Sequence, residues 1–460
     1  MKGTVSIVQC VDTEGPLYES LESTFERIKE AFDIELKPTE KVLEKLRNKE
    51  IELNGKEEVV CDFVSRKRLN YNDTWDKIYQ MLHIAFSDDF RYQILDSYGG
   101  GYCFNWFCID HVGFRYNPRR RAGGYHVIFE EYARLLKAYN CKTDRIYWHF
   151  HPKGFSQDAH RTGDNHSFSN LHNEILARRI IDHQWFPVAN RPTTSEHMDY
   201  NLWLEQWIPF DFANMNMMNN NGLESQTAAG RVPGRVADWR GAPTDWTIYH
   251  PSVWDSRRIG GLRRYIARCL YMNCRHSTIT EEELNNAFLS ANEGKNILVS
   301  VTNHDFRDMV AETKGFIALT RKVAAKYPKV KYKWSNAVEA MRHVLELTKE
   351  PPPVLSCKID KNLLYVTSNK PLWGPQPFLA IRTSEGNYYH DNFIINSETD
   401  WTYVFDKDSI LLDMVSKIGI ASNDTVGNTI VTVCDLDTPD NWKINYLNID
   451  DWIDDKIISV

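Results

Sequence analysis

The segment Arg145-Ile-Tyr-Trp-His-Phe-His-Pro-Lys-Gly154 predicts a short strand that ends in two histidines. Its aromatic and β-branched residues favour extended structure, and the proline and glycine that follow end the strand. His149 and His151 are two residues apart, so on a strand both imidazoles lie on the same face. Two neutral imidazoles at one strand end supply half of a zinc or iron site. Taken alone, such a pair is more often simply hydrogen-bonded or exposed, so the rest of the chain decides the interpretation.

Length and composition indicate an ordinary globular protein. A chain of 460 residues suits two or three domains, and 42% hydrophobic with 25% charged residues is typical of such proteins. The net charge of -7 argues against a general nucleic-acid-binding surface. The nine cysteines have no repeating spacing, which favours reduced, buried thiols over a disulfide framework.

The start of the chain indicates where the protein works. Met1-Lys2-Gly3 leads directly into the apolar strand Thr4 to Val11, which leaves no room for a signal peptide. No later run is long and apolar enough to cross a bilayer. We therefore expect a soluble, cytoplasmic protein without membrane insertion.

Strand-like and helix-like segments alternate from residue 1 to about 350, which predicts an α/β sheet or barrel with helices outside. Residues from about 17 to 100 interrupt this alternation as a large, mainly helical insertion that begins with highly charged helices. Arg257 to Met272 is predicted to be a helix. We treat residues 1–350 as one catalytic unit.

Polar, ionisable residues close six of the predicted strands. In parallel α/β folds the reactive groups collect at the carboxyl ends of the strands. Six such ends are difficult to explain by structural need alone, and they indicate the active face of an enzyme. The residues concerned are Asp12 and Glu14, Asp110 and His111, His149 and His151, Arg191, Asp211, and His304.

At these residues the chain resembles the polysaccharide deacetylases, the NodB-homology group of carbohydrate esterases. The resemblance implies a deformed (β/α) barrel with fewer than eight strands, and an enzyme that binds zinc or another divalent transition metal. It also implies a role for each residue: Asp12 is the general base, Glu14, His149 and His151 are metal ligands, Arg191 orients the base, His304 is the general acid, and Asp211 pairs with the network beside the base.

The sequence departs from the family pattern in three ways. Glu14 stands where the family usually has a second aspartate. The family histidines are usually spaced H-x-x-x-H rather than H-x-H, so His160 is an alternative to one of the two metal histidines. An insertion of more than a hundred residues separates the first motif from the second. A divergent subgroup of this kind, associated with bacterial surface-polysaccharide biosynthesis, is what the resemblance implies for the pathway.

The residue types themselves favour hydrolysis. Two imidazoles and one carboxylate leave zinc an open position for water, and the metal would polarise the carbonyl of an N-acetyl group. The expected substrate is an N-acylated sugar, whether free, nucleotide-linked or part of a glycan. Two alternatives stay open: another metal enzyme on the same face, either an amidohydrolase or an iron oxygenase with two histidines and one carboxylate, and a catalytically silent glycan-binding protein.

The basic segment Asn117-Pro-Arg-Arg-Arg121 follows the second of these strand ends. It is too short for a nucleic-acid-binding arm. It could bind a phosphate or carboxylate of a substrate, or form a solvated loop.

Residues 351–460 have a different pattern. Glu350-Pro-Pro-Pro353 is typical of a stiff linker, and short strands separated by turns follow it. This spacing predicts a small, all-β, sandwich-like domain. Glycan binding, packing against the catalytic unit and assembly into a homo-oligomer are all open roles for it.

Overall fold

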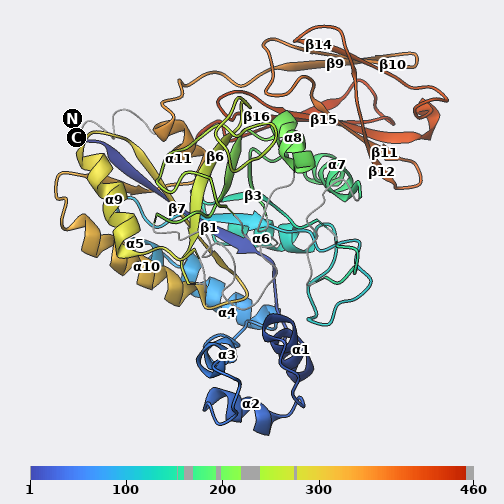
Figure 1. Cartoon of the computed structure of the whole chain (residues 1–460). Helices are drawn as coiled ribbons and strands as arrows, with labels where there is room; N and C mark the ends of the chain where they lie inside the picture. Colours follow the sequence, from blue (N-terminus) through green and yellow to red (C-terminus); the bar gives the residue numbers. More distant parts are fainter. Residues whose placement is uncertain are drawn as a thin grey trace.

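Seven parallel strands close into a barrel, and the buried segment at the start of the chain is its first strand (Figure 1). The computed structural model describes residues 2–152, 154–159, 169–192, 198–218, 239–273 and 277–451. Neighbouring strands around the barrel follow the order of the chain, and the seventh pairs again with the first. The strands are β1 (Thr4–Thr13), β2 (Phe104–Cys108), β3 (Arg145–Phe150), β4 (Ala189–Pro192), β5 (Phe210–Asn214), β6 (Tyr265–Tyr271) and β7 (Ile297–His304). This confirms the predicted deformed barrel.

Strand β1 is the centre of the sheet, and all ten of its residues are buried. One edge pairs with β7 from Val5 to Asp12. The other edge pairs first with a short eighth strand, β8 (Lys331–Trp334), and then with β2 from Gln9 onward. All three strands that pair with β1 are therefore distant from it along the chain.

Helices cover the outside of the barrel, as the alternation of segments predicted (Figure 1). Helix α4 packs into the same apolar cluster as β1 and β2, so this second half of the expected insertion belongs to the barrel wall. The helices around the barrel are α4 (Trp75–Phe86), α5 (Asp88–Tyr92), α6 (Val127–Ala138), α7 (Leu171–His183), α8 (Met198–Trp207), α9 (Glu281–Asn292), α10 (Met309–Ala324) and α11 (Ala337–Val344).

The prediction of a helix from Arg257 to Met272 was wrong. Residues Tyr265–Tyr271 form the buried strand β6 between β5 and β7. Arg268 is completely buried in this strand and pairs with both carboxylate oxygens of Glu283 on α9. The buried arginines Arg264 and Arg268 are four residues apart, a spacing that resembles the polar face of an amphipathic helix, and this explains the error.

Helix α11 closes the end of the barrel at which the strands begin. Its residues Ala337, Val338 and Met341 lie in the interior core with Val8 and Cys10 of β1. The interior is therefore filled below the middle of the strands, and functional side chains are confined to the opposite end.

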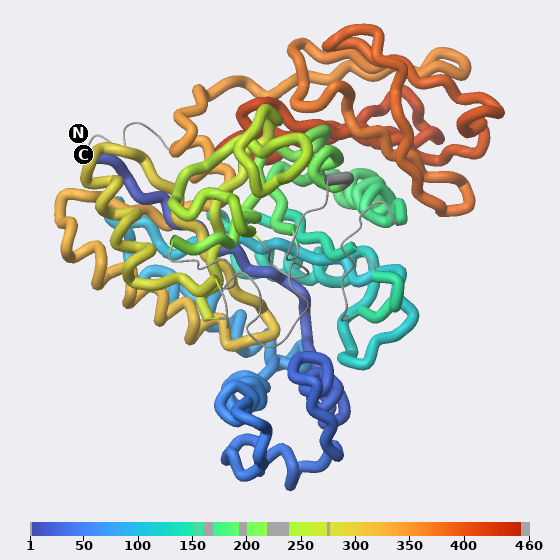
Figure 2. Tube along the Cα trace, viewed as in Figure 1, coloured from blue at the N-terminus to red at the C-terminus, as the bar shows by residue number. Residues whose placement is uncertain are grey.

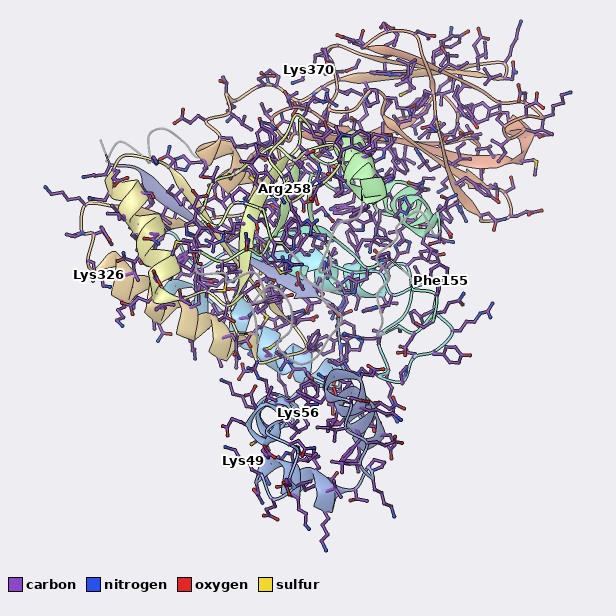
Figure 3. All side chains as sticks on the ribbon, viewed as in Figure 1. Lys49, Lys56, Phe155, Arg258, Lys326 and Lys370 are labelled. Carbon is purple, nitrogen blue, oxygen red and sulfur yellow. The ribbon has the colours of Figure 1, made fainter. Side chains whose placement is uncertain are left out.

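Helices α1 (Leu21–Phe32), α2 (Glu40–Arg47) and α3 (Glu57–Phe63) form a separate layer beyond the carboxyl end of β1 (Figure 2). They enclose a small apolar core of their own, which includes Phe25, Leu46 and Phe63. Lys49 lies at the edge of this layer (Figure 3), whereas Lys56 Nζ donates to the carbonyl oxygen of Phe32 at 2.8 Å. We call residues 17–72 the helical insertion, because backbone bonds of Leu17 and Asn72 close its base.

Two antiparallel sheets make up the C-terminal part of the chain. Residues of both sheets, such as Leu364 and Ile420, share one apolar core, so the sheets pack face to face as the predicted sandwich. One sheet contains β9 (Leu355–Asp360), β10 (Leu363–Ser368), β13 (Ile394–Ile395) and β14 (Asp400–Val404). The other contains β11 (Phe378–Thr383), β12 (Tyr388–Asp391), β15 (Val415–Asn423), β16 (Thr429–Asp435) and β17 (Trp442–Leu447), and a short 3-10 turn covers Leu412–Met414.

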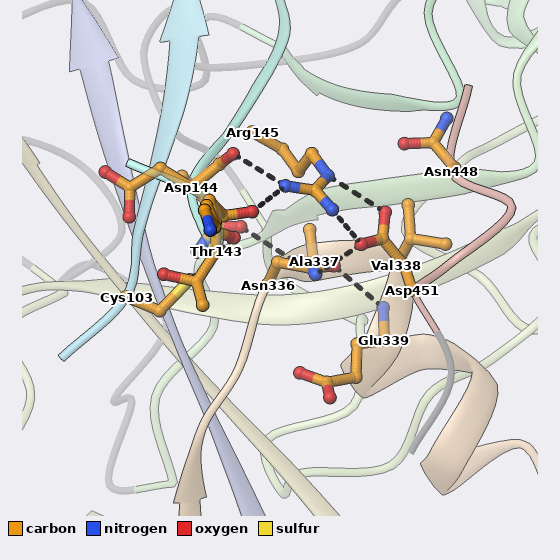
Figure 4. Close-up of polar contacts among 12 residues, drawn as sticks. Cys103, Thr143, Asp144, Arg145, Asn336, Ala337, Val338, Glu339, Asn448 and Asp451 are labelled. Carbon is orange, nitrogen blue, oxygen red and sulfur yellow. Dashed lines mark hydrogen bonds and ion pairs between the residues drawn. The ribbon is translucent and has the colours of Figure 1, made fainter. Parts of the chain in front are cut away.

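The sandwich is fixed to the barrel over a broad apolar contact. Helix α7 packs against β11 and β15, with Ile180 and Phe378 in one cluster. Near the chain end, Asp451 accepts hydrogen bonds from Arg145 at 2.5 and 3.1 Å and from Asn336 at 3.1 Å (Figure 4). No helix in the described part of the chain is long and apolar enough to cross a membrane.

Candidate metal centre

The inner faces of the barrel strands carry a layered pattern that leads up to the site. Cys10 lies in the interior core, so the alternation of β1 places Asp12 one step further along the same inward face. Tyr147 stands in the same relation to His149 on β3. Because the strands are parallel, their carboxyl ends meet at one end of the barrel, and the side chains above the core layer converge there.

Glu14, His149 and His151 come together at this end. One ligand atom of each lies within 4.8 Å of the others, a group that could hold a metal ion. The two imidazole rings have centroids 4.5 Å apart, as their spacing on the strand predicted. Burial, followed by the neighbouring His149, lowers the pKa of His151 well below its usual value, so its imidazole is neutral and available as a ligand.

A contact at Nδ1 fixes the orientation of the His149 ring. Its Nδ1 lies 2.7 Å from the carbonyl oxygen of Arg191, and a donated Nδ1–H leaves the lone pair on Nε2. Nε2 is buried, has no hydrogen-bond partner among the described residues, and lies 3.9 Å from Glu14 Oε1. Burial acts to lower the pKa of His149, but Asp12 and Glu14 raise it, so the site favours a positive charge. The same electrostatic environment fits a metal cation.

The carboxylate of Glu14 is held on one side by Arg121. Arg121 Nη2 lies 2.8 Å from Glu14 Oε2, and both side chains are buried. Burial acts to raise the pKa of Glu14, but Arg121 and then His149 outweigh it and hold the pKa well below its usual range. Oε1 is left facing the imidazoles of His149 and His304, at 3.9 and 3.8 Å.

Asp305 holds the backbone that carries Glu14. It accepts hydrogen bonds from the N–H groups of Glu14 and Gly15 at 2.9 and 2.8 Å, and from the hydroxyl of Tyr132 at 2.9 Å. Gly15 adopts φ +70°, and a Cβ there would lie 2.6 Å from Ile128 Cδ1, so glycine is strongly favoured where the chain turns away. The end of β1 is therefore a rigid support for its two acidic residues.

Asp12 forms a buried ion pair with Arg191. Arg191 Nε lies 2.6 Å from Asp12 Oδ1, and both side chains are at most 3% exposed. Arg191 Nη1 also donates to the carbonyl oxygen of Phe212 at 3.0 Å, which fixes the guanidinium across the barrel. Oδ1 is thereby occupied, and Oδ2 is the oxygen that faces His304.

His304 lies beside both acidic residues of β1. Its Nε2 is 3.7 Å from Asp12 Oδ2 and 3.8 Å from Glu14 Oε1. Its ring is stacked on Tyr271, with centroids 6.1 Å apart and an interplanar angle of 12°. Burial lowers the pKa of His304 to about 4, so its imidazole is neutral near pH 7.

Asp211 does not belong to the cluster formed by Asp12, Glu14 and the site histidines. Its neighbours Phe210 and Phe212 lie in the interior core, so the alternation of β5 directs Asp211 to the outer face of the barrel. There its carboxylate lies 2.7 Å from Arg264 Nη1 and accepts a 3.3 Å hydrogen bond from Asn190. The expected pairing with the network beside the base is therefore replaced by a structural ion pair.

Two residues after β2, Arg121 and His111, lie beside Glu14, although no specific role there was predicted for them from the sequence. Arg121 holds Glu14, and Asn117 fixes its loop by bonding both the N–H and the carbonyl of Arg121 at 2.8 and 2.9 Å. His111 is buried beside Glu14, and burial together with Arg121 lowers its pKa to about 3. The basic run and the strand end were visible in the sequence, but their distance from Glu14 was not. His160, the alternative ligand, lies outside the described residues.

We expect Asp305→Ala to weaken metal binding by about 10–100-fold, because the backbone of Glu14 loses its support. Two buried N–H groups would be left without an acceptor, at about 1–3 kcal/mol each in folding free energy. Metal titration and thermal unfolding measure the two effects. Tyr132→Phe removes only one of the three donors to Asp305 and is the matched control, with a smaller effect on both. Unchanged metal affinity in Asp305→Ala would contradict this role.

Comparisons with known proteins add little. No protein-family model matches the chain, and no curated protein matches it. Among solved structures the chain is similar to a Cellulomonas fimi endo-beta-1,4-mannanase double mutant, with 10% sequence identity and a TM-score of 0.22. The match covers 78% of this chain and 88% of that one. A similarity this low supports no conclusion about function, which must be inferred from the geometry of the site.

Proposed function

We propose that the protein is a metal-dependent hydrolase that removes an N-acyl group, in the simplest case acetyl, from an amino sugar. One observation supports this above the others. A group able to bind a metal, Glu14 with His149 and His151, lies beside a buried Asp12–Arg191 pair and a neutral His304. A metal site next to a carboxylate base and an imidazole is one of the arrangements that promote hydrolysis of an amide.

The chain offers the donors that a catalytic zinc site uses. Glu14 Oε1, His149 Nε2 and an imidazole nitrogen of His151 would hold Zn²⁺ or another divalent transition metal. When bound, the metal would polarise the acyl carbonyl and lower the pKa of a coordinated water. The second oxygen of Glu14 remains bound to Arg121, which limits the rotation of the carboxylate.

The protein side chains provide a path for the proton. Arg191 occupies Asp12 Oδ1 and keeps Oδ2 directed into the site, where it can accept a proton from the attacking water. Neutral His304 lies 3.7 Å from that oxygen, so it can receive the proton and deliver it to the departing nitrogen. Water adds to the carbonyl carbon, the C–N bond breaks, and the products are a free amine and the acid.

The sugar and the pathway are inferred from the resemblance to polysaccharide deacetylases. A role in surface-polysaccharide biosynthesis is consistent with it, and the substrate would be an N-acylated sugar that is free, carrier-linked or part of a glycan.

The test combines metal analysis with product analysis. We expect about one equivalent of metal per chain in the wild type, and loss of both metal and acetate release in His149→Ala and His151→Ala. His83→Ala is the matched control: this histidine lies away from the site on α4 and bonds to the hydroxyl of Tyr139 at 3.0 Å. It should retain metal and activity.

Two outcomes would change the conclusion. Metal retained in His151→Ala would transfer that ligand role to His160 or His111. Absence of metal in the reconstituted wild type, with all variants folded, would reject the hydrolase and leave a silent carbohydrate-binding protein as the interpretation.

A further inference from the structure

A cavity of about 120 Å³ opens directly beside the proposed catalytic residues. His304 and Tyr271 form its inner wall, and the helical insertion supplies its outer wall. The cavity therefore connects the site to the helical insertion, which is not part of the barrel. Its lining is Arg27, Phe63, Arg68, Tyr71, Tyr271, Asn273, Thr302, Asn303, His304, Phe306, Arg307 and Glu312.

Three arginines line this cavity, and the nearby carboxylates do not fully neutralise their positive charge. Arg27 lies 2.7 Å from Glu19, but Arg119 lies 2.9 Å from the other oxygen of the same carboxylate, so two guanidinium groups share one negative charge. Burial lowers the pKa of Arg119 to about 10, and Arg27 is among the groups that lower it. This crowding indicates an excess of positive charge behind the cavity wall.

Arg307 carries the clearest excess of charge. Its Nη1 donates to the carbonyl oxygen of Arg68 at 3.0 Å, and no carboxylate among the described residues lies within 4.0 Å of it. Arg68 has only a 3.5 Å contact with the half-exposed Asp62. Glu312, the single carboxylate among the described residues of the lining, accepts a hydrogen bond from Asn273 at 3.1 Å. Burial raises the pKa of Glu312, and Asn273 and Arg307 only partly oppose this rise.

Aromatic rings hold these guanidinium groups in place. Arg307 lies over Tyr71 with its carbon 4.9 Å from the ring centroid, and Arg27 lies over Phe63 at 4.5 Å. The rings of Tyr71 and Phe306 contact each other edge to face, at 6.0 Å. Arginine held in this way is preorganised for an oxyanion, because little side-chain freedom remains to be lost on binding.

We propose that this cavity binds an anionic group of the substrate, a phosphate or a carboxylate, next to the N-acyl group that is removed. The inference rests on the proposed function and narrows it: the substrate would be a negatively charged N-acylated sugar, either a sugar phosphate or a uronic acid. Arg68 and Arg307 supply the charge, and the helical insertion exists to complete this subsite.

Binding tests the subsite without requiring catalysis. In His149→Ala/His151→Ala protein, which lacks the metal ligands, N-acetylglucosamine 1-phosphate should bind about tenfold or more tightly than N-acetylglucosamine by calorimetry. Arg68→Gln/Arg307→Gln should remove that difference, and Arg307→Lys should retain part of it. Arg66→Gln is the matched control, because Arg66 is 81% exposed on the same segment and does not line the cavity. Glucuronic acid, compared with glucose, distinguishes a carboxylate from a phosphate site.

Measurements of activity then distinguish the proposed anion subsite from the proposed deacetylase function on which it rests. With metal present, the Arg68→Gln/Arg307→Gln variant should raise KM for the sugar phosphate by about tenfold and leave KM for the neutral sugar unchanged. Equal binding of charged and neutral sugars by the wild type, or binding unaffected by loss of both arginines, would overturn the subsite while any deacetylation stands. Arginine-dependent anion binding without acetate release from any substrate would retain the subsite and reject the deacetylase.

Discussion

Asp12→Asn is expected to lower the turnover number by about 10²–10⁴-fold and to leave the bound metal near one equivalent. The substitution keeps the shape of the side chain and its contact with Arg191 but removes the basic oxygen Oδ2 that faces His304. Because Asp12 is not one of the three grouped ligands, metal content should not follow activity. Steady-state kinetics and elemental analysis on the same preparation measure both quantities.

Glu14→Gln provides the contrast to this variant. Glu14 lies two residues after Asp12 on the same inward face and belongs to the group of three metal ligands. The substitution should therefore lower metal content and turnover together. If Asp12→Asn instead lost its metal, Asp12 would be a ligand and the base would have to be found elsewhere. If it kept full activity, the assignment of the base would be wrong.

Arg191→Met is expected to reduce the folding free energy by about 3–5 kcal/mol and to abolish turnover, because it leaves the carboxylate of Asp12 buried without a partner. The pair is almost completely enclosed, with Arg191 1% and Asp12 3% exposed, so water cannot replace the lost guanidinium. Combining Arg191→Met with Asp12→Asn should recover a large part of that stability, since no buried charge remains. Chemical unfolding of the four proteins measures the coupling.

Arg264→Met is the matched control for this experiment. Arg264 pairs with Asp211 at 2.7 Å and is as deeply buried as Arg191, but it lies on the outer face of the barrel. We expect a comparable loss of stability with turnover retained by the folded protein. A specific loss of turnover in Arg264→Met would restore Asp211 to the catalytic network.

The parts of the fold that follow from local pattern could be predicted from the sequence. The apolar run from Thr4 to Val11 and the alternation of segments indicated a parallel barrel, and the two-residue spacing of His149 and His151 indicated a shared face. Strand β6 could not be recognised, because Arg268 within it and Arg264 just before it are neutralised by Glu283 and Asp211 from other elements. Pattern alone does not reveal which charges find partners in the folded chain.

The environment of the site was less predictable than its central residues. Polar residues at strand ends pointed to Asp12, Glu14 and His304, because strand geometry directs them to a common point. The contacts of Arg121 and Asp305 depend on loops whose paths no periodicity describes. The cavity could not be predicted from the sequence for the same reason, because the cavity forms where the helical insertion meets the loop after β7.

The pairing of β1 has a consequence for how the protein is made. This strand precedes all of its partners in the sheet, which begin at residues 104, 297 and 331. Such a high contact order slows folding, and the barrel cannot close during synthesis until β7, at residues 297–304, has been translated. A ten-residue strand that is buried on both faces must therefore be protected from aggregation in the meantime, so production of the protein is expected to depend on chaperones.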